Sequence, residues 1–243
     1  MKIAVLSDIH GNSWALKEVL SDIKQRGIKA IYDLGDSLYG PLDPANTFEL
    51  IKESNIISIR GNQDRKIIEN NTFSETIPTL NYVLKVLSIE AINWLSELPF
   101  SRIIENAIFA CHGTPQSNTE YLIEQLNPGY IDVRDFVSLN NSLSDIKEKI
   151  VLCGHSHTPH IIETGTKTII NPGSVGLPAY DDDLPIAHKM QNFSPHTRYC
   201  ILDLDKKYKI EQVILPYDFE KAATMAERNN RPDWAKWIRT GTI

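Results

Sequence analysis

Seven side chains that could bind metal ions stand at or just beyond the ends of short apolar runs in this sequence. They are Asp8, His10, Asp36, Asn62, His112, His155 and His157. Carboxylate, amide oxygen and imidazole groups all ligate borderline transition metals. Seven such groups exceed the needs of one ion, and they suit two ions that share a bridging carboxylate. That arrangement can hold the attacking and leaving oxygens of a phosphoryl transfer.

The individual motifs also have structural interpretations. Asp8 and His10 are two residues apart, so an extended chain presents both on one side. An aspartate before a helix, however, is more often a turn or cap residue. The Gly-Asp step at Asp36 and the Gly-Asn step at Asn62 are, one at a time, ordinary turns. Their recurrence at successive strand ends favours a shared site.

The elements that must position these groups follow from apolar periodicity and turn residues. We expect strands at 2–7, 28–34, 56–60, 107–111, 150–153, 160–163, 167–170, 198–203 and 209–215. We expect helices at 13–26 and 42–54, over most of 65–98 with a break near Pro78, and twice in 218–243. Residues 116–149 are expected to form loop and two short helices. Residues 177–196 are expected to form a long loop that either lines a pocket or is passive surface.

Composition and charge narrow the class of protein. Of 243 residues, 42% are hydrophobic and 23% are charged, which is typical of a soluble globular protein. The net charge of -6 provides no electrostatic footprint for nucleic acid or an anionic membrane. We expect no signal peptide or membrane span, because no apolar run approaches about 18 residues. Three widely spaced cysteines argue against a disulfide framework, so we expect a cytoplasmic protein. We also expect a single domain over 1–243, because the sequence shows no domain linker.

Taken in order, the motifs resemble those of the calcineurin-like metallophosphoesterase superfamily, in particular its small bacterial and archaeal branch. The matching motifs are Asp-X-His at 8–10, Gly-Asp at 35–36, Gly-Asn-X-Asp at 61–64, His112 and Gly-His-X-His at 154–157, followed by the NPGSVG turn at 171–176 and the tail segment 231–234. The resemblance implies an α/β (α+β) fold in which two mixed β-sheets pack as a sandwich flanked by helices. Periodicity alone does not distinguish this sandwich from an open sheet.

The resemblance also implies roles for the seven residues. One divalent ion would be held by Asp8, His10 and His157, and a second by Asn62, His112 and His155, with the Asp36 carboxylate bridging them. Water bound between the ions would lose a proton near neutral pH and become a hydroxide nucleophile. Mn, Fe, Zn and Co all accept this ligand mixture. The implied substrate is a phosphorylated small molecule, with a nucleotide or dinucleoside polyphosphate as one option.

The sequence departs from the wider family at Gln63. Many members have a histidine there that acts as general acid toward the leaving group, with the following aspartate orienting it. A neutral amide donates a hydrogen bond but does not deliver a proton. We therefore expect phosphoanhydrides or aryl phosphodiesters, whose leaving groups need little protonation, to be favoured over alkyl monoesters. Asp64 would then be a turn or supporting residue.

Two other functional classes compete with a metal-dependent phosphohydrolase. Gln63 is compatible with a non-catalytic module that binds metal or nucleotide and regulates a partner, whereas the complete ligand set argues for an enzyme. A nuclease is disfavoured by the acidic balance and the absence of basic clusters. Substrate specificity belongs to pocket loops and not to the metal core, and the oligomeric state is open.

Several further residues have simpler interpretations. We expect a buried structural thiol at Cys111, solvated carboxylates at Asp181, Asp182 and Asp183, packing roles for Trp234 and Trp237, and surface or structural roles for Arg60, Arg65 and Arg198. His188 and His196 could contact phosphate, but this is the less favoured interpretation.

Overall fold

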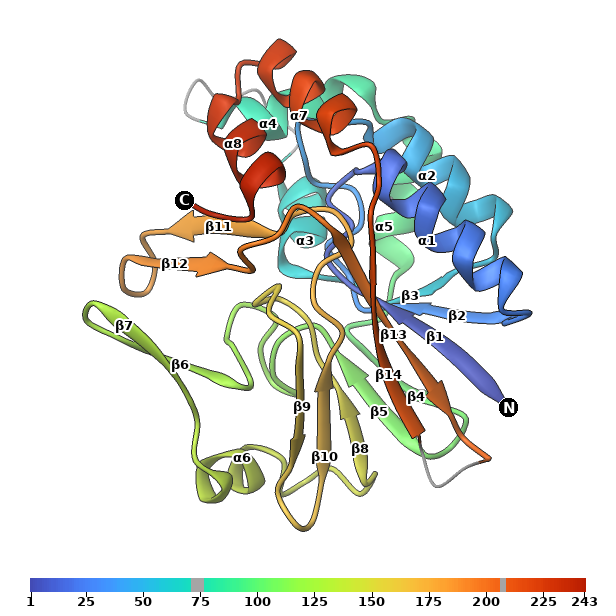
Figure 1. Ribbon diagram of the computed structural model, residues 1–243, viewed down its shortest axis with the longest axis vertical. Coiled ribbons are helices and arrows are strands. Elements are labelled where there is room, and N and C mark those ends of the chain that lie inside the picture. Colours follow the sequence, from blue (N-terminus) through green and yellow to red (C-terminus); the bar gives the residue numbers. More distant parts are fainter. Residues whose placement is uncertain (71–76, 206–208) are drawn as a thin grey trace.

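Two five-stranded mixed sheets form the centre of the computed structural model, which describes residues 1–70, 77–205 and 209–243 (Figure 1). The first sheet has the strand order β14-β13-β1-β2-β3. Its strands are β1 (Lys2–Leu6), β2 (Ala30–Asp33), β3 (Ile57–Ser58), β13 (Thr197–Asp203) and β14 (Lys209–Leu215). Strands β1, β2 and β3 run parallel, and β13 and β14 extend the sheet with antiparallel pairs.

The second sheet has the order β4-β5-β8-β10-β9, in which β5, β8 and β10 are parallel and the two outer strands are antiparallel to their neighbours. Its strands are β4 (Ser101–Ile104), β5 (Ile108–Cys111), β8 (Ile150–Leu152), β9 (His160–Glu163) and β10 (Thr168–Asn171). Parallel strands buried on both faces read as continuous apolar runs, which explains why β1, β5 and β8 stand out in the sequence.

The two sheets pack face to face through one apolar layer. Ile3 and Val5 of β1 belong to the same buried cluster as Ile108 of β5 and Leu152 of β8. This shared cluster confirms the expected sandwich of two mixed sheets, and it fixes the carboxyl ends of both sets of parallel strands along one edge.

Helices cover the outer face of the first sheet (Figure 1). They are α1 (Ser13–Gln25), α2 (Pro44–Glu53), α3 (Asn62–Glu69), α4 (Pro78–Val86), α5 (Ile89–Glu97), α7 (Phe219–Arg228) and α8 (Pro232–Thr240). In α1 the buried residues Leu16, Val19 and Ile23 recur at helical spacing, and the Asn12 side chain caps the first turn by accepting from the Ala15 amide at 3.1 Å. Within the described ranges, no helix combines the length and apolarity needed to cross a membrane.

The outer face of the second sheet is covered by α6 (Phe136–Ser142) and its flanking loops, which share a buried cluster with β5 and β8. Two hairpins lie nearby: β6 (Glu124–Asn127) with β7 (Tyr130–Val133), and β11 (Ala179–Asp182) with β12 (His188–Gln191). Both hairpins correct the sequence-based expectations, because 116–149 contains one helix and a hairpin, and 177–196 contains a hairpin where a loop was expected. Their short, polar strands lack the apolar runs that mark the sheet strands.

The helical expectation over 65–98 resolves into α3, α4 and α5, with Pro78 as the first residue of α4. Proline is well suited to the first turn of a helix, where its missing N–H leaves no hydrogen bond unmade. The part of this expectation that falls on 71–76 lies outside the described residues.

Candidate metal centre

The seven candidate ligands lie at the edge where the parallel strands of both sheets end. Asp8 and His10 follow β1, and Asp36 follows β2. Asn62 is the first residue of α3, directly after β3. In the second sheet, His112 follows β5, and His155 and His157 follow β8. Residues separated by up to 149 positions therefore come together because parallel strand ends share one edge.

One group of ligand atoms consists of the side chains of Asp8, His10 and His157, all buried and all within 4.8 Å of one another. The Nε2 atoms of His10 and His157 are 3.1 Å apart, and His157 Nε2 is 3.3 Å from Asp8 Oδ1. Asp8 Oδ1 is buried and has no hydrogen-bond partner among the described residues. A buried carboxylate oxygen without a partner is costly unless a cation satisfies it, so this group fits a metal ion.

A second group consists of Asp36, His112 and His155, whose ligand atoms also lie within 4.8 Å of one another. Asn62 joins it, because its Oδ1 is 3.0 Å from His112 Nε2. Asp36 Oδ2 is 3.5 Å from His112 Nε2 and 4.0 Å from His10 Nε2. The Asp36 carboxylate thus stands between the two groups and is placed to bridge them.

Backbone carbonyls orient three of the four imidazoles. The Nδ1 atoms of His10, His112 and His157 lie 2.8, 2.8 and 2.6 Å from the carbonyl oxygens of Tyr39, Leu34 and Leu177. An Nδ1–H that donates to a carbonyl leaves the Nε2 lone pair free, and in each case Nε2 faces the other ligands. This is the orientation that metal-ligating histidines adopt.

The electrostatics of the site shift the pKa values of its ligands in opposite directions. Burial lowers the pKa of His10 to about 4 and that of His155 to about 3, so both imidazoles are neutral at pH 7. Burial alone would raise the pKa of Asp8, but attraction to His157 outweighs it and holds the pKa below its usual range. Burial would lower the pKa of His112, yet the Asp36 carboxylate raises it to about 10. His112 therefore holds a proton at a place where the Asp36 carboxylate attracts positive charge, which a metal ion could also supply.

The backbone at this edge adopts conformations that ordinary residues avoid. Five candidate ligands have positive φ, namely Asp8 at 55°, His10 at 51°, Asp36 at 57°, His155 at 68° and His157 at 60°. Left-handed non-glycine residues cost energy and gather at functional sites. The strain persists here because neighbouring strand ends hold the loops, with the amides of Asp8 and His10 donating to Gly35 and Asp36 at 3.0 and 2.9 Å.

Asp64 fixes the loop that carries Asp36. Its carboxylate accepts from the backbone amides of Asp36 at 2.8 Å, Ser37 at 3.0 Å and Gly61 at 3.0 Å. The neighbouring Gln63 donates its backbone amide to Asp36 Oδ1 at 2.8 Å. Gly61 must be glycine at this contact, because a Cβ there would lie 2.1 Å from Asp36 Oδ1. Asp64 therefore positions the backbone around Asp36, and Gln63 contacts Asp36 directly.

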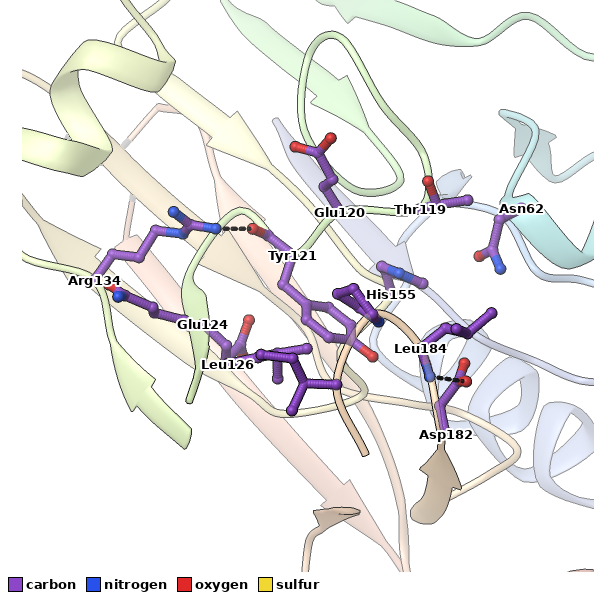
Figure 2. Close-up of a pocket in the computed structure, with 13 residues that line it drawn as sticks. Asn62, Thr119, Glu120, Tyr121, Glu124, Leu126, Arg134, His155, Asp182 and Leu184 are labelled. Carbon is purple, nitrogen blue, oxygen red and sulfur yellow. Dashed lines mark hydrogen bonds between the residues drawn. The ribbon is translucent and has the colours of Figure 1, made fainter. Parts of the chain in front are cut away.

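Two cavities open onto the centre. A cavity of about 220 Å³ is lined by His10, Gln63, His157 and Trp234, among others. A larger cavity of about 750 Å³ runs from Asn62 and His155 toward Arg134, between the 119–126 segment and the 182–186 segment (Figure 2). The segment 177–196 thus lines a pocket, which was one of its two expected roles.

Several residues around these cavities were not expected from any sequence motif. Tyr121 stacks on His155 with ring centroids 4.6 Å apart, and its hydroxyl lies 2.7 Å from that of Tyr180 and 2.8 Å from His188 Nε2. Tyr180 in turn donates to the His155 carbonyl at 3.0 Å. No local motif marks these tyrosines, because only the tertiary fold brings β11 and the segment before β6 against the Gly-His-X-His turn.

The structure also places the residues for which the sequence suggested structural or surface roles. Cys111 is buried, and burial raises the pKa of its thiol, which supports the structural role. Trp234 packs in the core beside Trp237, as expected, and its ring also meets His10 edge-on at 5.7 Å. Asp182 is exposed but lines both cavities. Within the described chain, the lining of these cavities contains none of Arg60, Arg65, Arg198, His188 and His196.

Comparisons with known proteins agree with this geometry. The sequence model of the calcineurin-like phosphoesterase superfamily domain matches residues 1–207. The chain is 32% identical over 255 residues to the uncharacterized protein MJ0912 of Methanocaldococcus jannaschii, covering 96% of this chain and 94% of the relative. The fold is similar to a metallophosphoesterase from Sphaerobacter thermophilus, with TM-score 0.78, 21% identity and coverage of 100% and 99% of the two chains. It is also similar to the hypothetical protein PH1004 of Pyrococcus horikoshii, with TM-score 0.73, 20% identity and coverage of 99% and 98%.

Proposed function

The chain belongs to the calcineurin-like phosphoesterase superfamily, and we propose that it binds two divalent metal ions and hydrolyses phosphodiester or nucleotide phosphoanhydride bonds. The observation that carries this proposal is the position of Asp36 Oδ2, which lies between two groups of metal-binding side chains. One group would be Asp8, His10 and His157, and the other Asn62, His112 and His155, with Mn, Fe, Zn and Co as the candidate metals.

When bound, the ions would polarise the phosphoryl oxygens and promote deprotonation of water. The protein supplies the geometry: the carbonyls that hold His10, His112 and His157 leave their Nε2 atoms available as ligands, so these residues would hold the ions. In the overall reaction a water oxygen forms a bond to phosphorus and one P–O ester or anhydride bond breaks. The leaving group departs as an anion with the electron pair of that bond, and the proton that the water loses passes to solvent. Gln63 lines the cavity beside these ligands and can donate a hydrogen bond to the leaving oxygen, without transferring a proton.

Removal and restoration of metal test the proposal directly. Protein stripped with a chelator and refilled with manganese should hydrolyse an aryl phosphodiester, and an Asp36→Asn variant should be at least about 100-fold less active, since it loses the bridging charge. Asp132→Asn, an exposed carboxylate on β7, is the matched control and should retain full activity. The proposal fails if refilled wild-type protein and Asp36→Asn hydrolyse the substrate equally.

A non-catalytic metal-binding module is the second candidate, and Gln63 is the observation that favours it. Two bound manganese ions per chain, measured by calorimetry, with no turnover of diesters or anhydrides would support this alternative. If the chain is an enzyme, Gln63→His should raise kcat/KM for alkyl esters relative to aryl esters, because imidazole can protonate a poor leaving group. An unchanged ratio of the two activities would contradict this interpretation of Gln63.

A further inference from the structure

The two cavities share Asn62, His155 and Asp182, so they meet at the candidate metal centre. A phosphate held there would have space on two sides: about 220 Å³ beside His10 and Gln63, and about 750 Å³ beside Tyr121. Small-molecule sites typically occupy about 300 to 1,000 Å³, so only the larger cavity has room for a substantial organic group. This arrangement suits a phosphate that carries two substituents of unequal size.

The larger cavity is apolar on one side. Leu126, Leu184 and Ile186 contribute to its lining, and the last two side chains are 75% and 37% exposed. In Figure 2, Leu184 and Leu126 approach the cavity from the two sides of the Tyr121 ring. Tyr121, which is 7% exposed and stacks on His155, adds an aromatic ring to this lining. Apolar side chains left in water beside a ring pair can be covered by an aromatic ligand at a gain in free energy.

The charges of the larger cavity disfavour a second phosphate. The exposed carboxylates of Glu120 and Asp182 line it together with the single guanidinium of Arg134. The Glu124 carboxylate also belongs to the lining, but it is buried and accepts from the Ser156 hydroxyl at 2.6 Å. Arg134 donates from Nη2 to the Tyr121 carbonyl at 3.3 Å, while its buried Nε has no partner among the described residues. An excess of negative charge repels an anionic substituent and therefore favours an uncharged one.

We propose that the substrate is a phosphodiester whose larger substituent is uncharged and aromatic, remains on phosphorus after hydrolysis, and occupies the larger cavity. The inference rests on the proposed function, because the phosphate is placed at the metal ions. It also narrows that function, since a dinucleoside polyphosphate would bring further phosphates toward Glu120 and Asp182.

Three probes that release the same para-nitrophenolate test the inference on manganese-loaded protein. They are methyl para-nitrophenyl phosphate, thymidine 5′-para-nitrophenyl phosphate, and the latter compound with an added 3′-phosphate. We expect kcat/KM for the thymidine diester to exceed that for the methyl diester by at least about 10-fold, which is a usual value for filling an apolar pocket. The added 3′-phosphate should remove most of this advantage.

Two variants link the preference to this cavity. Ile186→Trp fills the cavity, so the thymidine-to-methyl ratio should fall toward one. Glu120→Lys reverses an exposed charge at the cavity and should raise activity on the 3′-phosphorylated probe relative to the neutral one by about 5-fold or more. Ile214→Trp, on the exposed face of β14 and outside both cavities, is the control and should leave all three activities unchanged.

Binding of thymidine itself, followed by saturation-transfer NMR, separates the failure of the inference from that of the proposed function. Hydrolysis without a thymidine preference, or a preference that Ile186→Trp leaves intact, would overturn the inference while the phosphodiesterase stands. If no probe is hydrolysed but thymidine binds wild-type protein and not Ile186→Trp, the aromatic site stands and the proposed function fails. Absence of both hydrolysis and binding would overturn the inference together with the function.

Discussion

The edge where the parallel strands of both sheets end, here called the strand-end edge, differs from the two hairpins in burial and backbone conformation. Five of the seven candidate ligands at this edge are buried, and five have left-handed backbone. In the β6–β7 and β11–β12 hairpins, by contrast, every strand has an exposed residue. The strand-end edge places charged and polar groups in mostly buried positions that the backbone of both sheets fixes. The hairpins line a cavity with side chains that can change without disturbing the sheets. Under the proposed function, the sheets would therefore fix the reaction chemistry and the hairpins would determine substrate choice.

A pair of glycine substitutions provides the largest expected contrast between the two regions. Gly35 and Gly129 have φ of +100° and +87°, so alanine is strained at both. At Gly35 a Cβ would also lie 2.4 Å from the Gly61 amide nitrogen, whereas at Gly129 nothing lies within 4 Å. Gly35→Ala should lower the free energy of unfolding by at least about 3 kcal/mol and abolish manganese binding, and Gly129→Ala by about 1 kcal/mol.

Urea denaturation and manganese calorimetry on the two glycine variants measure this contrast. Equal stability losses would show that the strand-end edge relaxes as readily as a hairpin turn, and the comparison between the regions would fail.

A pair of aspartate substitutions tests whether capping backbone amides matters more at the strand-end edge. Asp64→Ala leaves the buried amides of Asp36, Ser37 and Gly61 without their acceptor, so we expect a stability loss of about 3 kcal/mol and a clear drop in kcat. The exposed Asp135 accepts from the amides of Val137 and Ser138 at 2.9 Å, and water can replace it. Asp135→Ala should therefore lose little stability and no activity. A similar loss of kcat in both variants would contradict this assignment.

A pH titration of stability sharpens the comparison further. Burial raises the pKa of Asp33 to about 8, and its Oδ2 accepts from the Ser37 hydroxyl at 2.6 Å. The folded state therefore holds a proton that the unfolded state releases above about pH 4, so this residue makes the protein less stable as pH rises toward 8.

The isosteric variant Asp33→Asn should remove that loss. Between pH 5 and pH 7 it should gain stability on wild type by at most about 3 kcal/mol, because each pH unit contributes at most about 1.4 kcal/mol. Asp183→Asn, at an exposed carboxylate of the 182–186 segment, should follow the wild-type curve. Parallel curves for all three proteins would show that Asp33 is not the source of the pH dependence.

The same division explains what the sequence could predict. Asp8, Asp36 and His112 are found from sequence because each follows an apolar run long enough to mark a buried strand. The two-sheet arrangement was expected only from the family resemblance of the ordered motifs, since periodicity does not specify which strands pair. The hairpins were missed because β11 reads Ala-Tyr-Asp-Asp and has no apolar alternation, although Asn127-Pro128-Gly129 is a recognisable turn between β6 and β7. The position of Tyr180 depends on the β11–β12 pairing, and Tyr121 meets it only in the folded chain.

The smallest expected effect lies where the two regions touch, at Tyr121. Its ring stacks on His155, and its hydroxyl contacts only Tyr180 and His188 among the described residues. Tyr121→Phe keeps the ring and removes the hydroxyl, so stability should fall by about 1 kcal/mol with manganese affinity nearly unchanged. Tyr121→Leu also removes the stacking that holds His155, and should weaken manganese binding by about 10-fold. If Tyr121→Phe weakens manganese binding as much as Tyr121→Leu does, the hydroxyl network of the hairpins is part of the metal centre, and the two regions are one.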